Sequence, residues 1–123
     1  MVKVLITGAA GYLGSTLTEV LLDRGYSVDA LDNLMYEQTS LLHLCSNKNF
    51  RFVNTDVTNF KFLKSIIPTY DVIIPLAAIV GGPACDKNKE LATKVNFEQI
   101  KCIVDNITTE QKLIMPNTNS QYR

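Results

Sequence analysis

Short runs of aliphatic and β-branched residues alternate along the chain with longer segments whose apolar residues recur at helical spacing. The short runs predict strands over residues 2–6, 27–31, 50–53, 71–76 and 111–115. The helical spacing predicts helices over residues 13–24, 37–45, 59–67 and 86–106. Gly25 is the expected C-cap of the first helix, and Pro68 is expected to stop the third.

Strands that alternate with helices imply crossover connections, and therefore a parallel sheet with both faces covered. Right-handed crossovers predict a doubly wound α/β sheet of the Rossmann type, with its ligand crevice at the carboxyl ends of the strands. Glycines and polar residues gather at those ends. With 123 residues, the chain is expected to form one domain around this sheet.

Residues 7–14 read Thr-Gly-Ala-Ala-Gly-Tyr-Leu-Gly and lie between the first predicted strand and the first predicted helix. This spacing is typical of a loop that binds a dinucleotide pyrophosphate. Gly8 would make the tight turn, Gly11 would let the phosphates approach the backbone, and Gly14 would allow close helix packing. The helix N-terminus would then face the phosphates. A glycine-rich turn without a ligand is the alternative.

Polar residues follow the second and third predicted strands. Asp32 lies about 20 residues beyond the glycine loop, where a carboxylate receives the adenosine ribose hydroxyls and repels a 2′-phosphate, which favours NAD over NADP. A simple helix or turn cap is the alternative. Asp56 is a candidate acceptor for the adenine amino group, with the Val57 backbone alongside, but an Asx-turn is a rival interpretation. The small side chains of Ala77 and Ala78 would let either a nucleotide or a packed helix come close to the backbone.

Composition narrows the function classes. Apolar residues make up 46% of the chain, which indicates a globular protein, and twelve basic side chains balance twelve acidic ones. We therefore expect neither nucleic acid nor an anionic membrane as a partner. The three cysteines have no metal-type spacing, so we expect no metal and reduced thiols in a cytoplasmic protein without a signal peptide. His43 is the single histidine, and no Ser or Cys partner is evident for it.

Six motifs occur in one order along the chain: Thr7-Gly8-x-x-Gly11-x-x-Gly14, Asp32-Asn33, Asp56-Val57, Leu76-Ala77-Ala78, Val95-Asn96 and Pro116-Asn117-Thr118-Asn119-Ser120-x-Tyr122. Together they resemble the amino-terminal half of an extended short-chain dehydrogenase/reductase, specifically an NAD-dependent nucleotide-sugar epimerase/dehydratase. The resemblance covers essentially the whole chain. It implies that the chain binds NAD.

The resemblance also implies a role for each matching residue. The pyrophosphate would be held by Gly8, Gly11, Tyr12, Leu13 and Gly14; the adenosine ribose by Asp32 and Asn33; and the adenine by Asp56 and Val57. The middle of the cofactor would be lined by Leu76, Ala77 and Ala78, with support from Asn96 on the long helix. Thr118 matches the residue that hydrogen-bonds the reacting sugar oxygen, and it is the catalytic candidate. Tyr122 matches an aromatic residue that is not catalytic.

The departure from the family pattern concerns catalysis. Such enzymes use a Tyr-x-x-x-Lys pair to move the proton, and no such pair occurs in this sequence. The later strands and the carboxy-terminal substrate domain are expected to be absent, as after a natural truncation or frameshift. The chain is then expected not to turn over alone. The alternatives are a non-catalytic nucleotide-binding module and a fragment that acts with a partner chain.

A sheet that ends at its fifth strand would leave an open edge and a helix without a neighbour. We expect the long helix to expose some of its apolar residues: Leu91, Val95, Ile100, Ile103 and Val104. A homo-oligomer, with charged substitutions at Val95 or Ile103 breaking it, is the expected consequence.

Overall fold

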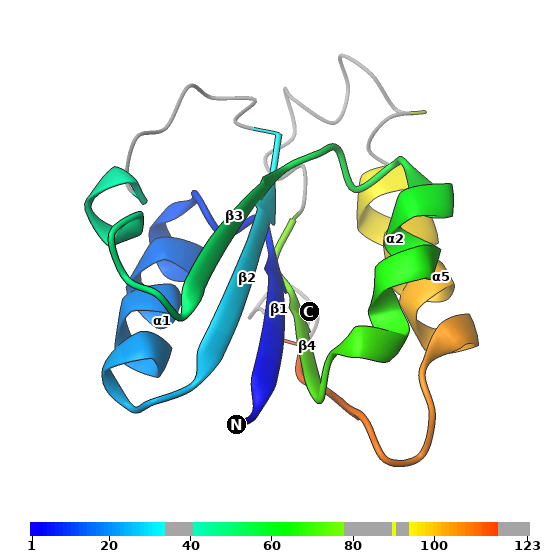
Figure 1. The fold of residues 1–123 in the computed structure, drawn as a ribbon. Coiled ribbons are helices and arrows are strands. Elements are labelled where there is room, and N and C mark those ends of the chain that lie inside the picture. The colour runs from blue at the N-terminus through cyan, green and yellow to red at the C-terminus, as the bar shows by residue number, and fades with distance from the viewer. Residues whose placement is uncertain (34–40, 78–89, 91–93, 116–123) are drawn as a thin grey trace, which may run out of the picture.

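The computed structural model describes residues 1–33, 41–77, 90 and 94–115. Within them, five parallel strands form one sheet in the order β3-β2-β1-β4-β5 (Figure 1). The strands are β1 (Lys3–Thr7), β2 (Ser27–Asp32), β3 (Phe50–Asn54), β4 (Val72–Pro75) and β5 (Lys112–Leu113). The chain winds outward from β1 first in one direction and then in the other. This order confirms the predicted doubly wound parallel sheet.

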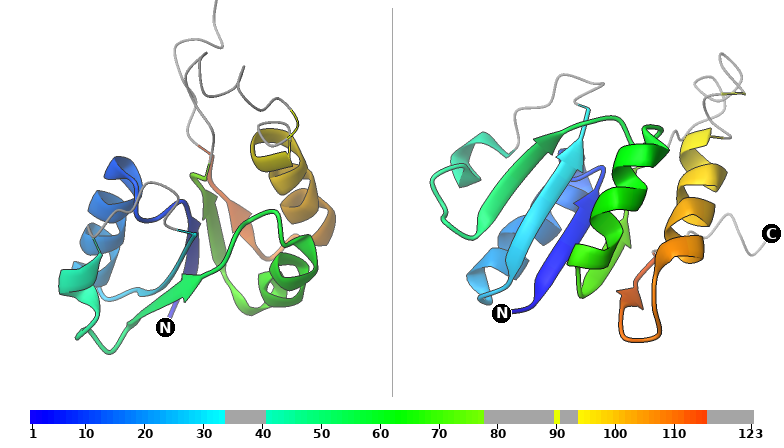
Figure 2. Two further views of the ribbon diagram at one scale, coloured as in Figure 1. Left: turned by 90° about the horizontal axis from the view of Figure 1, so that it is seen from above. Right: turned by 45° about the vertical axis from the view of Figure 1, so that its right-hand side comes forward.

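Helices cover both faces of the sheet, as the two orthogonal views show (Figures 1 and 2). Helix α1 (Tyr12–Asp23) lies on one face, and helices α2 (Phe60–Ile66) and α5 (Gln99–Asn106) lie side by side on the other. Alternate side chains of each strand therefore enter different cores. Val4 of β1 packs in the cluster on the α1 side, and Leu5 packs in the cluster beneath α2 and α5.

Local sequence explains where α1 and α2 end or begin. Gly25 has φ +91° and its N–H donates to Leu22 O at 3.1 Å, while the Tyr26 N–H donates to Leu21 O at 3.1 Å. This pair of bonds is a Schellman motif, which confirms Gly25 as the residue that ends α1. Asn59 caps α2, because its side chain accepts the Phe62 N–H at 3.3 Å.

Three predicted elements differ from the structure. Of the helix expected over 37–45, the described part contains a 3₁₀ turn at Leu42–Leu44, and residues 34–40 lie outside the described ranges. Of the helix expected over 86–106, the described part contains α5, preceded by a π-helical turn at Lys94–Glu98, and residues 86–89 and 91–93 lie outside the described ranges. The fifth strand is two residues long, although the Ile114 N–H beyond it still donates to Ile73 O at 3.0 Å.

The buried face of the α5 segment also differs from the expectation. Val95 and Ile103 are 6% and 0% exposed and belong to the core beneath α2 and α5, so they do not form an open surface. Of the five residues among which exposure was expected, Val104 is exposed, at 50%, and Leu91 lies outside the described residues. Phe97, which was not among the five, is also exposed, at 64%. The expectation that charged substitutions at Val95 or Ile103 would act on an interface is wrong, because both side chains hold the fold together.

A buried carboxylate links β2, β3 and the segment before β4. Asp29 is 6% exposed and accepts the Tyr70 hydroxyl at 2.6 Å and an Arg51 guanidinium N–H at 2.6 Å. Burial, followed by the hydrogen bond to Asp29, raises the pKa of Tyr70, so the hydroxyl keeps its proton and remains a donor. Tyr70 from inside and the largely exposed Arg51 from the surface thus satisfy the buried carboxylate, and the three side chains serve the fold.

Candidate functional site

The glycine loop joins the carboxyl end of β1 to α1. Its backbone is bonded to the neighbouring strand, since the Gly8 N–H donates to Leu31 O at 2.9 Å. Gly8 has φ +67°, and a Cβ there would lie 2.5 Å from Ala77 N. A Cβ at Gly14 would lie 2.6 Å from Gly8 O. Both distances are too short for real contacts, so the loop's own packing requires glycine at these two positions.

Gly11 differs from the other two glycines of the loop. Among the described residues, a Cβ at Gly11 would meet Gly8 O at 3.4 Å, an ordinary contact, and its φ of −71° suits any residue. Gly11 is also the N-cap of α1, and the first turn of α1 carries no acidic side chain. The helix N-terminus and the space beside Gly11 therefore suit an anion.

Asp32, at the end of β2, lies against the glycine loop. Its Oδ2 accepts the Ala10 N–H at 3.0 Å, and the side chain is half-buried. The carboxylate therefore fixes the loop from the β2 side. The sequence left open whether Asp32 caps a turn or faces a ligand. The bond from the Ala10 N–H shows that Asp32 caps the turn of the glycine loop.

Asp56 forms the Asx-turn that was the rival interpretation of this residue. Its Oδ1 accepts the Thr58 N–H at 2.9 Å and the Thr58 hydroxyl at 2.8 Å. Its Oδ2 accepts the Asn33 amide at 3.2 Å, which joins the ends of β2 and β3. Burial acts to raise the pKa of Asp56, but the bonds from Thr58 and Asn33 favour the carboxylate, and the pKa lies below its ordinary value.

The lowered pKa of Asp56 predicts a small loss of stability in acid. The unfolded chain binds this proton more readily, so the contribution is complete above the ordinary carboxyl pKa and is lost as the pH falls through the folded value. Urea unfolding at pH 6 and pH 3 should show a smaller loss in Asp56→Asn than in the unaltered chain. The difference should stay below about 1 kcal/mol, because solvent screens the site. Equal losses would mean that Asp56 does not gain from its partners.

A buried glutamine, which the sequence did not single out, lies at the carboxyl ends of β1 and β4. Gln99 is 0% exposed, and its Oε1 accepts the Thr7 hydroxyl at 2.6 Å. Its Nε2 donates to Ala77 O and to Val95 O, both at 2.8 Å. The Ala77 N–H in turn donates to Thr7 Oγ1 at 3.2 Å. A glutamine on a helix that packs on a sheet gives no local signal of such distant partners.

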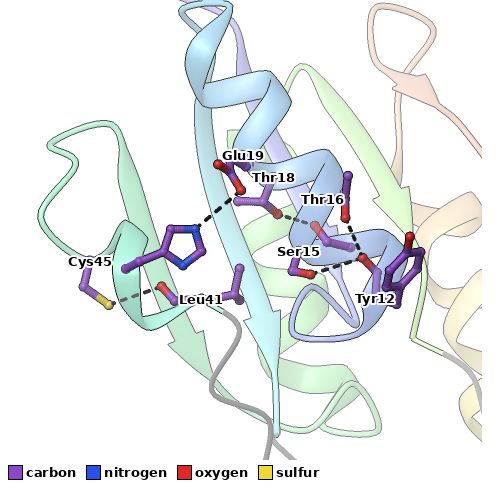
Figure 3. Close-up of polar contacts among 9 residues, drawn as sticks. Tyr12, Ser15, Thr16, Thr18, Glu19, Leu41 and Cys45 are labelled. Carbon is purple, nitrogen blue, oxygen red and sulfur yellow. Dashed lines mark hydrogen bonds and ion pairs between the residues drawn. The ribbon is translucent and has the colours of Figure 1, made fainter.

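The hydroxyl groups at the start of α1 are bonded to carbonyls of that helix, as Figure 3 shows. Ser15 and Thr16 both donate to Tyr12 O, at 3.1 and 3.0 Å, and Thr18 donates to Gly14 O at 2.6 Å. The large side chains of Tyr12 and Leu13 in the same turn are exposed, at 91% and 53%.

The single histidine lies on the outer side of α1. His43 Nε2 is 3.5 Å from Glu19 Oε2, and both side chains are more than half exposed. The Cys45 thiol, on the same turn, donates to Leu41 O at 3.8 Å (Figure 3). These groups form surface contacts between α1 and the 3₁₀ turn, and they do not form a nucleophile–base pair.

The remaining predicted site residues are placed as follows. Leu76 is half-buried directly after β4, and Val57 is buried in the core beneath α2 and α5. Asn96 is exposed on the π-helical turn. Ala78 and Thr118 lie outside the described residues. Among the residues that are described, no helix is long and apolar enough to cross a membrane.

A doubly wound sheet with a glycine loop and a carboxylate at the strand ends defines the class of dinucleotide-binding α/β domains. The family model of the NAD dependent epimerase/dehydratase family matches residues 4–122. The chain belongs to this family. The match confirms the resemblance that the six motifs carry.

Known proteins align with this chain over part of their length. UDP-glucuronate 4-epimerase from Thermodesulfobacterium geofontis is 34% identical in an alignment 128 positions long that covers 96% of this chain and 40% of the relative. UDP-N-acetyl-alpha-D-glucosaminuronate decarboxylase from Bacillus cytotoxicus is 30% identical in an alignment 122 positions long that covers 98% of this chain and 37% of the relative. The chain thus spans about 40% of the length of these curated relatives.

A solved structure shows the same architecture. The crystal structure of UDP-glucuronic acid 4-epimerase from Bacillus cereus, in complex with UDP-glucuronic acid and NAD, superposes with a TM-score of 0.85 at 27% identity. The superposition covers 98% of this chain and 41% of the epimerase.

Proposed function

We propose that residues 1–123 form the NAD-binding domain of a nucleotide-sugar epimerase/dehydratase. The observation that carries the proposal is the contrast within the glycine loop. Gly8 and Gly14 are explained by contacts inside the protein, whereas no described residue would crowd a side chain at Gly11, at the N-terminus of α1. A pyrophosphate that approaches this backbone accounts for glycine at position 11. When bound, NAD takes up a hydride from a sugar carbon and returns it.

The proposed roles follow the family pattern. Gly8, Gly11, Tyr12, Leu13 and Gly14 would hold the pyrophosphate, with Asp32 and Asn33 at the adenosine ribose, Asp56 and Val57 at the adenine, and Leu76, Ala77, Ala78 and Asn96 along the middle of the cofactor. Support comes from the sheet order, because β2 and β4 flank β1 and place Asp32 and Ala77 on opposite sides of Gly8. Thr118 remains the proposed catalytic residue.

We further propose that the 123-residue chain does not turn over alone. Proton transfer to and from the sugar needs an acid–base group, and the sequence contains no Tyr-x-x-x-Lys pair. The second candidate function rests on this observation. It is a nucleotide-binding module that acts beside a complementing chain or a second copy of itself, in the cytoplasm.

The substrate class follows from the names of the relatives. The two curated relatives named above and the superposed structure are named for UDP-linked uronic acids, although two of the three are epimerases and one is a decarboxylase. A UDP-sugar is therefore the proposed substrate class of the whole protein, and the reaction is not assigned.

Calorimetric titration with NAD and ADP-ribose tests the proposal. We expect both to bind with similar affinity, because the proposed contacts are to the adenosine and pyrophosphate parts that the two ligands share. If neither NAD nor ADP-ribose binds, the proposed function is overturned. A much tighter value for NAD would show that the nicotinamide is held as well, contrary to the proposal.

Two variants of Asp32 separate its two proposed contacts. Asp32→Asn keeps an oxygen that can accept the Ala10 N–H but loses the charge that repels a 2′-phosphate. It should reduce the preference for NAD over NADP, since charge is the basis of that preference. Asp32→Ala removes both the acceptor oxygen and the charge, and it should further weaken the binding of both NAD and NADP. An unchanged preference in Asp32→Asn would mean that the carboxylate does not face the ribose.

A further inference from the structure

We propose that Gln99 is a positioning residue of the nucleotide site, an inference that rests on the function proposed above. Its side-chain amide ties together the carboxyl ends of β1 and β4 and the beginning of α5. The glycine loop leaves the end of β1, and the end of β4 flanks it on the side away from Asp32. Gln99 acts through Ala77 and Thr7.

The hydrogen bonds fix the orientation of the amide. Both Nε2 hydrogens meet carbonyl oxygens, those of Ala77 and Val95, and Oε1 meets the Thr7 hydroxyl. A rotated amide would place its oxygen against two carbonyl oxygens in a fully buried site, at a large cost in desolvation. One orientation is therefore strongly favoured, and the three elements are held in one arrangement.

The network acts on the wall of the proposed site through Ala77. The Ala77 N–H donates to Thr7 Oγ1 and the Ala77 carbonyl accepts from Gln99, so both backbone polar groups are bonded inside the protein. Ala77 also lies in tight contact with Gly8, where a Cβ would approach Ala77 N to 2.5 Å. A shift of Ala77 would therefore move the wall against which the glycine loop packs.

The same amide reaches into the π-helical turn before α5. Its bond to Val95 O places a side-chain donor on a carbonyl of that turn, four residues earlier in the chain. Single π-helical turns within helices are frequent at functional sites, where they aim a side chain that a regular helix would not. The turn and the buried glutamine together connect α5 to the strand ends.

Gln111 offers a matched control at the opposite end of the sheet. Its Nε2 donates to Ile67 O and Tyr70 O, both at 2.7 Å, and its Oε1 accepts the Thr108 N–H at 2.9 Å. It thus makes the same set of bonds as Gln99, two donated to carbonyls and one accepted. The carbonyls of Ile67 and Tyr70 precede the amino end of β4, whereas that of Ala77, the partner of Gln99, follows its carboxyl end.

The test compares Gln99→Met with Gln111→Met. Methionine preserves side-chain length and removes the amide, so both variants should lose stability in urea unfolding. Calorimetry under conditions in which both variants are fully folded should show about tenfold weaker binding of ADP-ribose to Gln99→Met. The affinity of Gln111→Met for ADP-ribose should change by no more than about twofold. Gln99→Met should weaken the binding of AMP, which lacks the second phosphate and ribose, less than it weakens the binding of ADP-ribose. Thr7→Val, which removes one hydroxyl, provides a milder variant should Gln99→Met not fold.

Three results would overturn this inference. The first is wild-type affinity for ADP-ribose in folded Gln99→Met, or in Thr7→Val where the former does not fold. The second is an equal loss of affinity in Gln111→Met, since lost stability would then account for the effect. The third is absence of ADP-ribose binding by the unaltered chain, which would also overturn the proposed function. An unaltered chain that binds ADP-ribose distinguishes the first two failures from the third.

Discussion

Alanine in place of Gly8 should remove about 3 kcal/mol or more of the free energy of unfolding. Gly8 has φ +67°, a conformation that costs a non-glycine residue about 1–2 kcal/mol. The new Cβ would also lie 2.5 Å from Ala77 N and 2.8 Å from Leu76 C. Both atoms are backbone, so no flexible side chain can move aside, and the end of β4 would have to shift. Urea unfolding of Gly8→Ala measures the loss.

Gly25→Ala is the matched control for this prediction. Gly25 also has a left-handed backbone, with φ +91°, but no heavy atom of the described residues lies within 4 Å of its built Cβ. It should lose about 1–2 kcal/mol from the backbone conformation alone. Equal losses in the two variants would show that the contact between the glycine loop and β4 does not contribute.

Gly11→Ala completes the series, because it separates folding from binding. Its backbone and its surroundings accept a Cβ, so the free energy of unfolding should stay close to that of the unaltered chain. ADP-ribose should nevertheless bind more weakly, since the methyl group would occupy space proposed for the pyrophosphate. Unchanged binding would count against the placement of the phosphates at Gly11.

The parts of the fold that the sequence predicted are those that depend on local rules. A parallel strand buried on both faces is an apolar run, as the central strands β1 and β4 are, and each of the five predicted runs contains a strand of the expected doubly wound sheet. Gly25 was recognisable as a C-cap because a left-handed residue after a helix favours glycine strongly. The glycine loop combines strand, glycine spacing and helix within a short stretch, and its position could be predicted for the same reason.

The parts that the sequence missed depend on partners distant in the chain. Gln99 bonds to Thr7 and Ala77, 92 and 22 residues away, and no spacing rule connects them. The Asx-turn of Asp56 with Thr58 is local and was among the interpretations of the sequence, whereas the bond from Asn33 was not, because Asn33 reaches Asp56 only after β2 and β3 have paired. The strand order of the folded sheet, and not the local sequence, decides which of these polar side chains meet.

The buried face of the α5 segment was misjudged for a geometric reason. The buried residues Val95, Gln99 and Ile103 are spaced by four, and the first of them lies in the π-helical turn. Residues spaced by four share one face of a helix, and this face packs against Leu5 of β1 and Leu63 of α2. The expectation of a helix without a neighbour therefore assigned Val95 and Ile103 to an open surface that the sheet and α2 already cover.

Adjacent substitutions on α5 separate the core from the surface of this helix. Ile103→Asp should unfold the chain or cost more than about 3 kcal/mol, because it places an unpaired charge at a position that is 0% exposed. Val104→Asp changes the neighbouring residue in the same way at 50% exposure, and the free energy of unfolding should change by less than about 0.5 kcal/mol. Urea unfolding of both variants measures the contrast, and a comparable loss in the two would contradict the assignment of faces.

Val104→Asp also tests the proposed association of two copies. Phe97 and Val104 are exposed on the α5 segment, and Ile114 is 52% exposed just beyond β5, where the described sheet ends. Covering such apolar residues favours association, and a second copy of the chain is the proposed occupant. Light scattering at micromolar concentration should give twice the mass of one chain for the unaltered protein and the mass of one chain for Val104→Asp. A single-chain mass for the unaltered protein would overturn the proposed dimer, and a dimer that survives both Val104→Asp and Phe97→Asp would exclude this face as its interface.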